Sequence, residues 1–308
     1  MKFKKIEDNF IKMCRFALST HRWSLMYKNI NSNKYIDIEQ PSNLSRADSF
    51  IIESNNKIYI FFEEFATGPF YKKGHLSVGE LDINRNKLIN IQNILEKKYH
   101  LSYPFIFKYN SAWYAIPETH QNNSIDLYKF TLFPYAMEKV RTLVDNINAV
   151  DTTLTIKDSI VYLFTNIKRH GKDHSNNLSL FFSDDLLNGS FAQHPMNPLV
   201  TDNRYARMAG GFLKEGGTLY RFAQDCSINY GACMYKFEII ELTKNKYKED
   251  RVESLYRPQE CLASHTFNKS KNFIVIDVQY RAKSAVQFFR NIGNLFLLAF
   301  KKVIGLKK

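Results

Sequence analysis

Short apolar runs rich in isoleucine, valine, tyrosine and phenylalanine alternate with asparagine, glycine, aspartate and lysine through most of the 308-residue chain. Runs of this length, bounded by turn-forming residues, are typical of β-strands. Long helical periodicity is absent until the C-terminal tail. The pattern therefore predicts an all-β body followed by one helix.

A strand–turn–strand unit recurs at a spacing of roughly fifty residues, which indicates a repeat architecture. The five copies begin at Ala47, Ser102, Val150, Ala206 and Ser264. The first four place a tyrosine at equivalent positions: Tyr59, Tyr114, Tyr162 and Tyr220. A third strand and a more polar segment follow each of these four hairpins. Four strands per unit predict a propeller blade.

The fifth hairpin has no further strands after it, whereas WSLMYKN and KYIDIEQ precede the first hairpin and have no blade of their own. If these N-terminal strands complete the last blade, two open sheet edges disappear. The sequence thus predicts a five-bladed β-propeller over residues 21–281. A basic segment precedes it at 1–20, and a basic amphipathic helix follows at 282–308. The alternative is a two-sheet sandwich with accidental periodicity.

Polar side chains on the innermost strands of a propeller face the axis, where they meet water, a ligand or one another. The innermost strands carry Asp48, Tyr103, Asp151, Arg204, Arg207 and His265. The second strands end at further acids, which include Glu63, Glu64, Glu118, Asp225 and Asp277. Repulsion and burial raise the pKa of some carboxylates in such a ring, which suits acid–base chemistry on sugars. The ring also suits the binding of hydroxyl groups without chemistry.

Structural roles are open for the same residues. Asp48 and Asp151 could cap turns or pair with Arg207, and the strand-end acids could simply be solvated. The guanidinium groups of Arg204 and Arg207 could grip a phosphate or carboxylate, or form salt bridges. His265 could be a core residue, a sugar contact or part of a cation site. One histidine without clustered partners does not predict a metal site, and the sequence identifies no cofactor.

The net charge of +13 is concentrated in residues 281–308, which contain seven lysines and arginines and no acid. No basic helix interleaved with base-stacking aromatics occurs in the rest, so no nucleic-acid partner is expected. The four cysteines form no CxxC pair. Their low density favours a reducing compartment.

Eight segments of the chain, taken in order, resemble the N-terminal domain of glucosamine inositolphosphorylceramide transferase and its bacterial relatives. They are ADSFII, IFFEEF, LSYPFIF, IPETHQNNSIDLY, AVDTTL, ARMAGG, AQDCS and SHTFN. The resemblance covers about residues 20–280 and implies a relationship to the five-bladed propellers of arabinanases, invertases and levansucrases. In those glycosidases an aspartate on the first blade acts as base or nucleophile, and Asp48 matches it. Asp151 matches an orienting aspartate on the third blade.

The fourth blade departs from the glycosidase pattern, because Arg207 and Met208 stand where a glutamate acts as the acid. An arginine suits a phosphate leaving group, which needs charge neutralisation more than a proton. We therefore predict a glycosyltransferase-like enzyme that acts on an activated, phosphate-bearing sugar. Arg204 and Arg207 would hold the phosphate, and the sugar would contact Glu64, Tyr103, Glu118, Asp225 and His265. The alternatives are a noncatalytic glycan-binding or scaffolding propeller and a glycosidase with a displaced acid.

The tail has a helical stripe of apolar residues flanked by basic ones, and its longest apolar run, 295–300, is too short to span a bilayer. Such a helix can lie at the membrane interface, where lysines meet anionic lipid. We expect residues 285–308 to attach a cytoplasmic protein to the inner leaflet, in surface polysaccharide or glycolipid assembly. The alternative is a helix packed on the propeller or on a partner.

Overall fold

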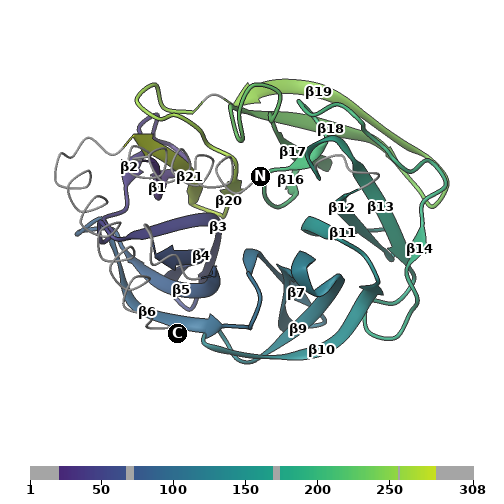
Figure 1. Ribbon diagram of the computed structural model, residues 1–308, viewed down its shortest axis with the longest axis horizontal. Helices are drawn as coiled ribbons and strands as arrows, with labels where there is room; N and C mark the ends of the chain where they lie inside the picture. Colours follow the sequence, from purple (N-terminus) through teal and green to yellow (C-terminus); the bar gives the residue numbers. More distant parts are fainter. Residues whose placement is uncertain (1–20, 67–72, 169–173, 256, 282–308) are drawn as a thin grey trace, which may run out of the picture.

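The computed structural model describes residues 21–66, 73–168, 174–255 and 257–281. They form five antiparallel sheets arranged around a central axis, as a propeller (Figure 1). The segment 1–20 and the helix expected over 282–308 lie outside the described residues. Within the described ranges, no helix has the length and apolar character needed to cross a membrane.

The first four blades follow one another along the chain, each with its innermost strand first. The first blade comprises β3 (Leu44–Ser54), β4 (Lys57–Ala66), β5 (His75–Asp82) and β6 (Lys87–Leu95). The second comprises β7 (Ser102–Tyr109), β8 (Ala112–Glu118), β9 (Ser124–Leu132) and β10 (Ala136–Asp145). The third comprises β11 (Ala149–Lys157), β12 (Ile160–Ile167), β13 (Leu178–Ser183) and β14 (Ala192–Gln193). The fourth comprises β15 (Arg207–Met208), β16 (Leu213–Glu215), β17 (Thr218–Gln224), β18 (Met234–Leu242) and β19 (Tyr247–Leu255).

The last blade joins the two ends of the propeller. Its strands, from the axis outward, are β20 (Phe267–Lys269), β21 (Phe273–Arg281), β1 (His21–Asn29) and β2 (Ile36–Asp37). β1 pairs with β21 over its whole length. The predicted closure by N-terminal strands is therefore confirmed, and the two-sheet sandwich is excluded.

Neighbouring blades cover both faces of the inner strands of each sheet, which explains the unbroken apolar runs in those strands. In β4, the consecutive residues Ile60, Phe61 and Phe62 are all fully buried. Phe61 packs in the cluster shared with the second blade, whereas Ile60 and Phe62 pack toward the last blade. Successive side chains of a strand point to opposite faces, so a sheet buried on both sides needs apolar residues at every position.

Candidate functional site

A pocket of about 230 Å³ opens on the axis, where the innermost strands begin and the second strands end. All five blades or their connecting segments contribute to it. The pocket is lined by Trp23, Ala47, Asp48, Glu63, Phe65, His100, Ser102, Glu118, Asp151, Arg207, Tyr230 and His265. Its lining combines buried charges of both signs with aromatic rings.

An irregularity repeated in the first three blades directs side chains toward the axis. The pairing of the two inner strands shifts register between Ala47 and Phe50, and equivalent shifts occur in the second and third blades. The residue inside each shift has a positive φ: 52° at Asp48, 43° at Tyr103 and 53° at Asp151. A bulge re-aims a side chain, and aspartate tolerates this conformation better than most residues.

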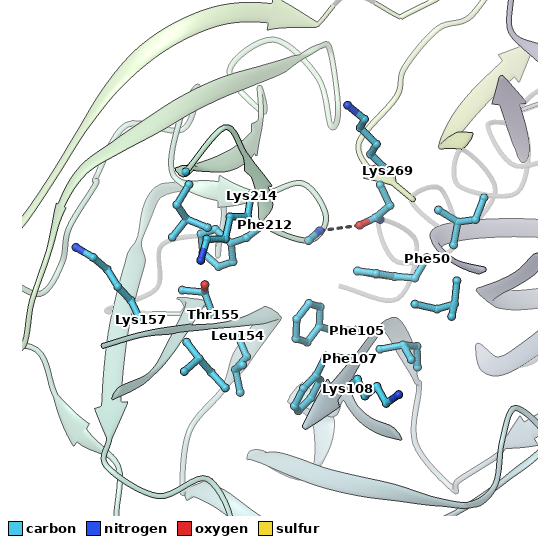
Figure 2. Close-up of a pocket in the computed structure, with 18 of the residues that line it drawn as sticks. Phe50, Phe105, Phe107, Lys108, Leu154, Thr155, Lys157, Phe212, Lys214 and Lys269 are labelled. Carbon is cyan, nitrogen blue, oxygen red and sulfur yellow. Dashed lines mark hydrogen bonds between the residues drawn. The ribbon is translucent and has the colours of Figure 1, made fainter. Parts of the chain in front are cut away.

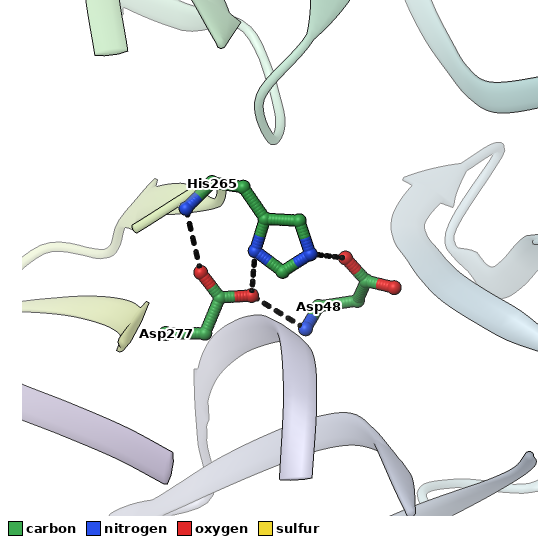
Figure 3. A group of neighbouring side chains, drawn as sticks. All are labelled: Asp48, His265 and Asp277. Atoms are coloured by element: carbon green, nitrogen blue, oxygen red, sulfur yellow. Dashed lines mark hydrogen bonds and ion pairs between the residues drawn. The ribbon is translucent and has the colours of Figure 1, made fainter. Parts of the chain in front are cut away.

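His265 lies between two carboxylates that belong to different blades (Figure 3). Its Nδ1 is 2.7 Å from Asp277 Oδ2, and its Nε2 is 3.3 Å from Asp48 Oδ1. Asp277 also accepts hydrogen bonds from the backbone N–H groups of Asp48, His265 and Thr266, at 2.8, 3.0 and 2.9 Å. Asp277 therefore links the last blade to the first beneath the pocket.

Burial alone would lower the pKa of His265, but Asp277 and Asp48 raise it to about 9. Burial would raise the pKa of Asp277, yet the His265 charge and the hydrogen bonds hold it below its ordinary value. At neutral pH this trio contains an imidazolium whose two ring nitrogens form ion-pair contacts with Asp277 and Asp48.

Ligand atoms of Asp48, His265 and Asp277 lie within 4.8 Å of one another, close enough to surround a cation. However, both ring nitrogens of His265 already face carboxylates, and the Asp277 oxygens accept several N–H groups. A metal ion would need His265 to lose its proton. The donor set thus fits a protonated histidine better than a metal ion.

Arg207 and Asp151 form a second charge pair across the third and fourth blades. Arg207 Nε donates to Asp151 Oδ2 at 2.7 Å, and the guanidinium lies 4.9 Å from the Tyr230 ring centre. The two outer guanidinium nitrogens have no hydrogen-bond partner among the described residues. They are available to a ligand in the pocket. The salt-bridge alternative is therefore correct for Arg207, but it occupies only one edge of the group.

Two glutamates on the opposite side of the pocket are each paired with a histidine. His100 Nε2 is 3.1 Å from Glu63 Oε1, and its Nδ1 accepts a hydrogen bond from the Gly74 N–H. His120 Nδ1 is 2.7 Å from Glu118 Oε1. These contacts hold both carboxylates in place at the pocket wall.

The carboxylates of the pocket differ in proton affinity. Burial raises the pKa of Asp48 well above its ordinary value, with further contributions from neighbouring carboxylates, and it raises the pKa of Asp151 to about 6 in spite of Arg207. Burial also raises the pKa of Glu63. Burial opposes ionisation of Glu118 too, but His120 and Arg207 lower its pKa below the usual value. Carboxyl groups whose pKa values are pushed apart can act as acid and base in one site.

The structure places four predicted site residues outside the pocket. Tyr103 lies beneath it, with its hydroxyl group 2.7 Å from Thr153 Oγ1 and 2.9 Å from the Gly210 carbonyl oxygen. Glu64 binds Arg46, and Asp225 binds Ser227 and Tyr235. Arg204 has a side chain that is 53% exposed and pairs with Asp202. Tyr103 instead fills the channel below the site.

Among the residues that line the pocket, Trp23, His100 and Tyr230 were not identified from the sequence, and Glu63 was identified only as a strand-end acid and not as a sugar contact. A signal existed for Glu63, because it follows Tyr59 at the same distance as Glu118 follows Tyr114. Side chains alternate along a strand, so Glu63 faces the axis and Glu64 faces away. Trp23, which stacks on the His265 ring at 4.2 Å, belongs to the closing strand β1. No repeat signal marks Trp23, His100 or Tyr230.

The fold and the pocket define a five-bladed propeller with a small, charged pocket on its axis. A family model described as glucosamine inositolphosphorylceramide transferase 1, N-terminal, matches residues 9–284. The chain belongs to this family, as the sequence motifs indicated. Glucosamine inositolphosphorylceramide transferase 1 of Oryza sativa subsp. japonica is 32% identical over 213 residues, which are 68% of this chain and 28% of the relative. The chain spans less than a third of the length of the curated relatives it matches.

Solved structures of carbohydrate-active enzymes share the fold. The catalytic domain of the Coprinopsis cinerea α-L-arabinofuranosidase has a TM-score of 0.55 and 11% identity, covering 87% of this chain and 99% of that domain. Levansucrase of Bacillus subtilis has a TM-score of 0.54 and 12% identity, covering 76% of this chain and 79% of the enzyme. At these identities the likeness concerns the fold alone.

Proposed function

We propose that this chain is a carbohydrate-active propeller that transfers a sugar from an activated, phosphate-bearing donor in surface polysaccharide or glycolipid assembly. The observation that carries the proposal is the pocket, in which buried carboxylates face the outer nitrogens of Arg207 beside aromatic rings. The names of the curated relatives, which are transferases, support the reaction class.

The pocket suits a single sugar residue. Its volume of about 230 Å³ lies below the range of roughly 300–1,000 Å³ typical of drug-sized ligands. Carboxylates accept hydrogen bonds from hydroxyl groups, the guanidinium donates to ring or phosphate oxygens, and an aromatic face can cover the apolar side of a sugar ring. Trp23 and Tyr230 supply such faces.

Arg207 supports a phosphate-bearing ligand. Its two outer nitrogens can donate to phosphate oxygens as a planar pair, and its charge would offset the charge that develops on a departing phosphate. Asp48 would act as base, since a raised pKa makes it a stronger base than a solvated aspartate. Asp151 would orient Arg207 through the 2.7 Å contact.

A ligand screen tests the phosphate requirement. We expect sugar 1-phosphates or nucleotide-activated sugars to raise the melting temperature more than the corresponding free sugars, because ligand at 100 times its Kd stabilises the folded state by about 2.7 kcal/mol. In Arg207→Met the phosphate-dependent part of the shift should disappear. Arg204→Met, which removes an exposed arginine, should keep it. Equal shifts for free and phosphorylated sugars in the unmodified chain would contradict the phosphate assignment.

Noncatalytic glycan binding is the second candidate function. The chain corresponds to less than a third of its curated relatives, so catalysis in those proteins could reside elsewhere in their sequence. A glycosidase would need a displaced acid, for which Glu63 is available in the pocket because burial raises its pKa. Sugar turnover by variants of Asp48 distinguishes an enzyme, which should lose activity, from a noncatalytic binding module.

Membrane attachment through residues 285–308 at the inner face also remains a proposal, supported by the apolar stripe and the basic flanks of that segment. We expect the full chain to float with anionic liposomes and a chain lacking 285–308 to stay in the soluble fraction, because each lysine near an anionic surface contributes about 1 kcal/mol. Flotation that is unchanged by the deletion would disprove this anchor.

A further inference from the structure

A second cavity, of about 610 Å³, lies at the opposite end of the channel (Figure 2). The innermost strands lead from one site to the other. Within β3 the chain passes from Asp48 in the pocket to Ile52 in the cavity, and within β11 it passes from Asp151 to Lys157. The Tyr103 side chain, which bridges to Thr153 and Gly210, separates the two spaces. The second cavity is therefore distinct from the proposed sugar pocket.

The floor of this cavity is aromatic. Phe50 and Phe105 pack edge to face with their ring centres 5.8 Å apart, and Phe107 stacks on Phe105 at 5.4 Å. Phe212 and Leu154 continue the apolar surface toward the fourth and third blades (Figure 2). Phe50 and Phe105 are largely covered by their neighbours, so they present a small apolar floor, which can take the hydrocarbon part of a ligand.

The rim of the cavity is basic. Four blades each contribute one lysine near the end of an innermost strand or hairpin: Lys108, Lys157, Lys214 and Lys269. Asp158 is the one carboxylate among the described lining residues. Lys269 pairs with Glu215, and Lys157 donates to the Leu242 carbonyl oxygen.

Two of the four lysines form no hydrogen bond or ion pair with the described residues. Lys108 and Lys214 have no hydrogen-bond or ion-pair partner among the described residues, although Lys108 lies 5.8 Å from the Trp113 ring centre. Their ammonium groups come from the second and fourth blades, on either side of the phenylalanine floor (Figure 2). A negatively charged group above the floor would be attracted by both.

We propose that this cavity binds an anionic lipid, with its phosphate at the basic rim beside Lys108 or Lys214 and its hydrocarbon chain on the floor of Phe50, Phe105 and Phe107. A purely polar anion would leave the aromatic floor uncovered, and a neutral hydrocarbon would leave the lysines unpaired. The tail of this chain cannot supply the charge, because residues 281–308 contain seven basic residues and no acid. The proposal is independent of the sugar pocket.

Isothermal titration of the full chain with monomeric dodecyl phosphate, below its micelle concentration, tests the site. We expect the double variant Lys108→Gln/Lys214→Gln to bind at least tenfold more weakly than the unmodified chain. The matched control Lys129→Gln/Lys248→Gln removes the same charge from exposed outer strands and should bind normally. Inorganic phosphate and a neutral dodecyl polyoxyethylene ether should each bind at least tenfold more weakly than dodecyl phosphate.

Three results would overturn the proposal. Equal binding of the neutral ether would show an apolar surface without charge recognition, and equal binding of inorganic phosphate would show an anion site without a lipid. An equal loss in the control variant would show nonspecific charge attraction. Asp48→Asn should bind dodecyl phosphate normally, so the lipid site and the sugar site can fail separately.

Discussion

Replacing Asp48 with asparagine should lower sugar transfer by about 10²–10⁴-fold, the range that one acid–base group contributes. Asparagine has nearly the same shape and tolerates the positive φ of 52° at this position. The fold should therefore persist while the proton acceptor is lost. The measurement is turnover of the donor that the ligand screen identifies, with circular dichroism to verify folding.

The control for this prediction is Asp202→Asn, which removes an acid that pairs with the exposed Arg204 outside the pocket. It should leave turnover unchanged. A noncatalytic binding module would show no turnover in either protein, and Asp48→Asn would keep much of its sugar affinity. Full transfer activity in Asp48→Asn would show that Asp48 is not the base.

Replacing Asp277 with asparagine should lower the free energy of unfolding by about 3–5 kcal/mol, the usual cost of removing one partner from a buried ion pair. Asp277 is fully buried and accepts hydrogen bonds from three backbone N–H groups in addition to its contact with His265. The asparagine amide would remove the closer of the two carboxyl groups that face the imidazolium. Urea unfolding at neutral pH measures the loss.

The pH dependence of stability distinguishes this charge effect from a packing defect. The folded-state pKa of His265, about 9, lies above the ordinary value of 6.5, so its stabilisation is complete below about pH 6.5 and is lost as the pH rises to 9. For a shift of this size the loss is about 3 kcal/mol. Asp277→Asn should flatten this decline. The double variant His265→Gln/Asp277→Asn should be more stable than Asp277→Asn alone, and equal stability would contradict the ion-pair explanation.

The repeat architecture could be predicted because each blade carries its own local signals. Tyrosines at matching positions, turn residues between apolar runs and a count of strands identify the blades without any knowledge of their packing. The two N-terminal strands that have no blade of their own predicted the closure, since an open sheet edge favours aggregation. β1 and β21 pair as that argument requires.

The site could be predicted only in part. Five predicted residues meet in the pocket because they occupy repeated positions on or beside the two inner strands. They are Asp48, Glu118, Asp151, Arg207 and His265. Arg204 and Asp225 lie beyond the inner-strand pairs, in segments whose conformation the repeat does not specify. Glu64 differs from Glu63 by a single position, and one position reverses the face of a strand.

The sequence by itself determined the five blades, the strand that closes them and the inner-strand positions from which charged groups reach the axis, because these follow from periodicity. Only the tertiary structure decided which groups meet. It pairs Arg207 with Asp151 and places His265 between Asp48 and Asp277. It also places the Tyr103 side chain between the two cavities. Those contacts join blades that are distant along the chain, and their geometry depends on how far each blade rotates around the axis, which no local pattern encodes.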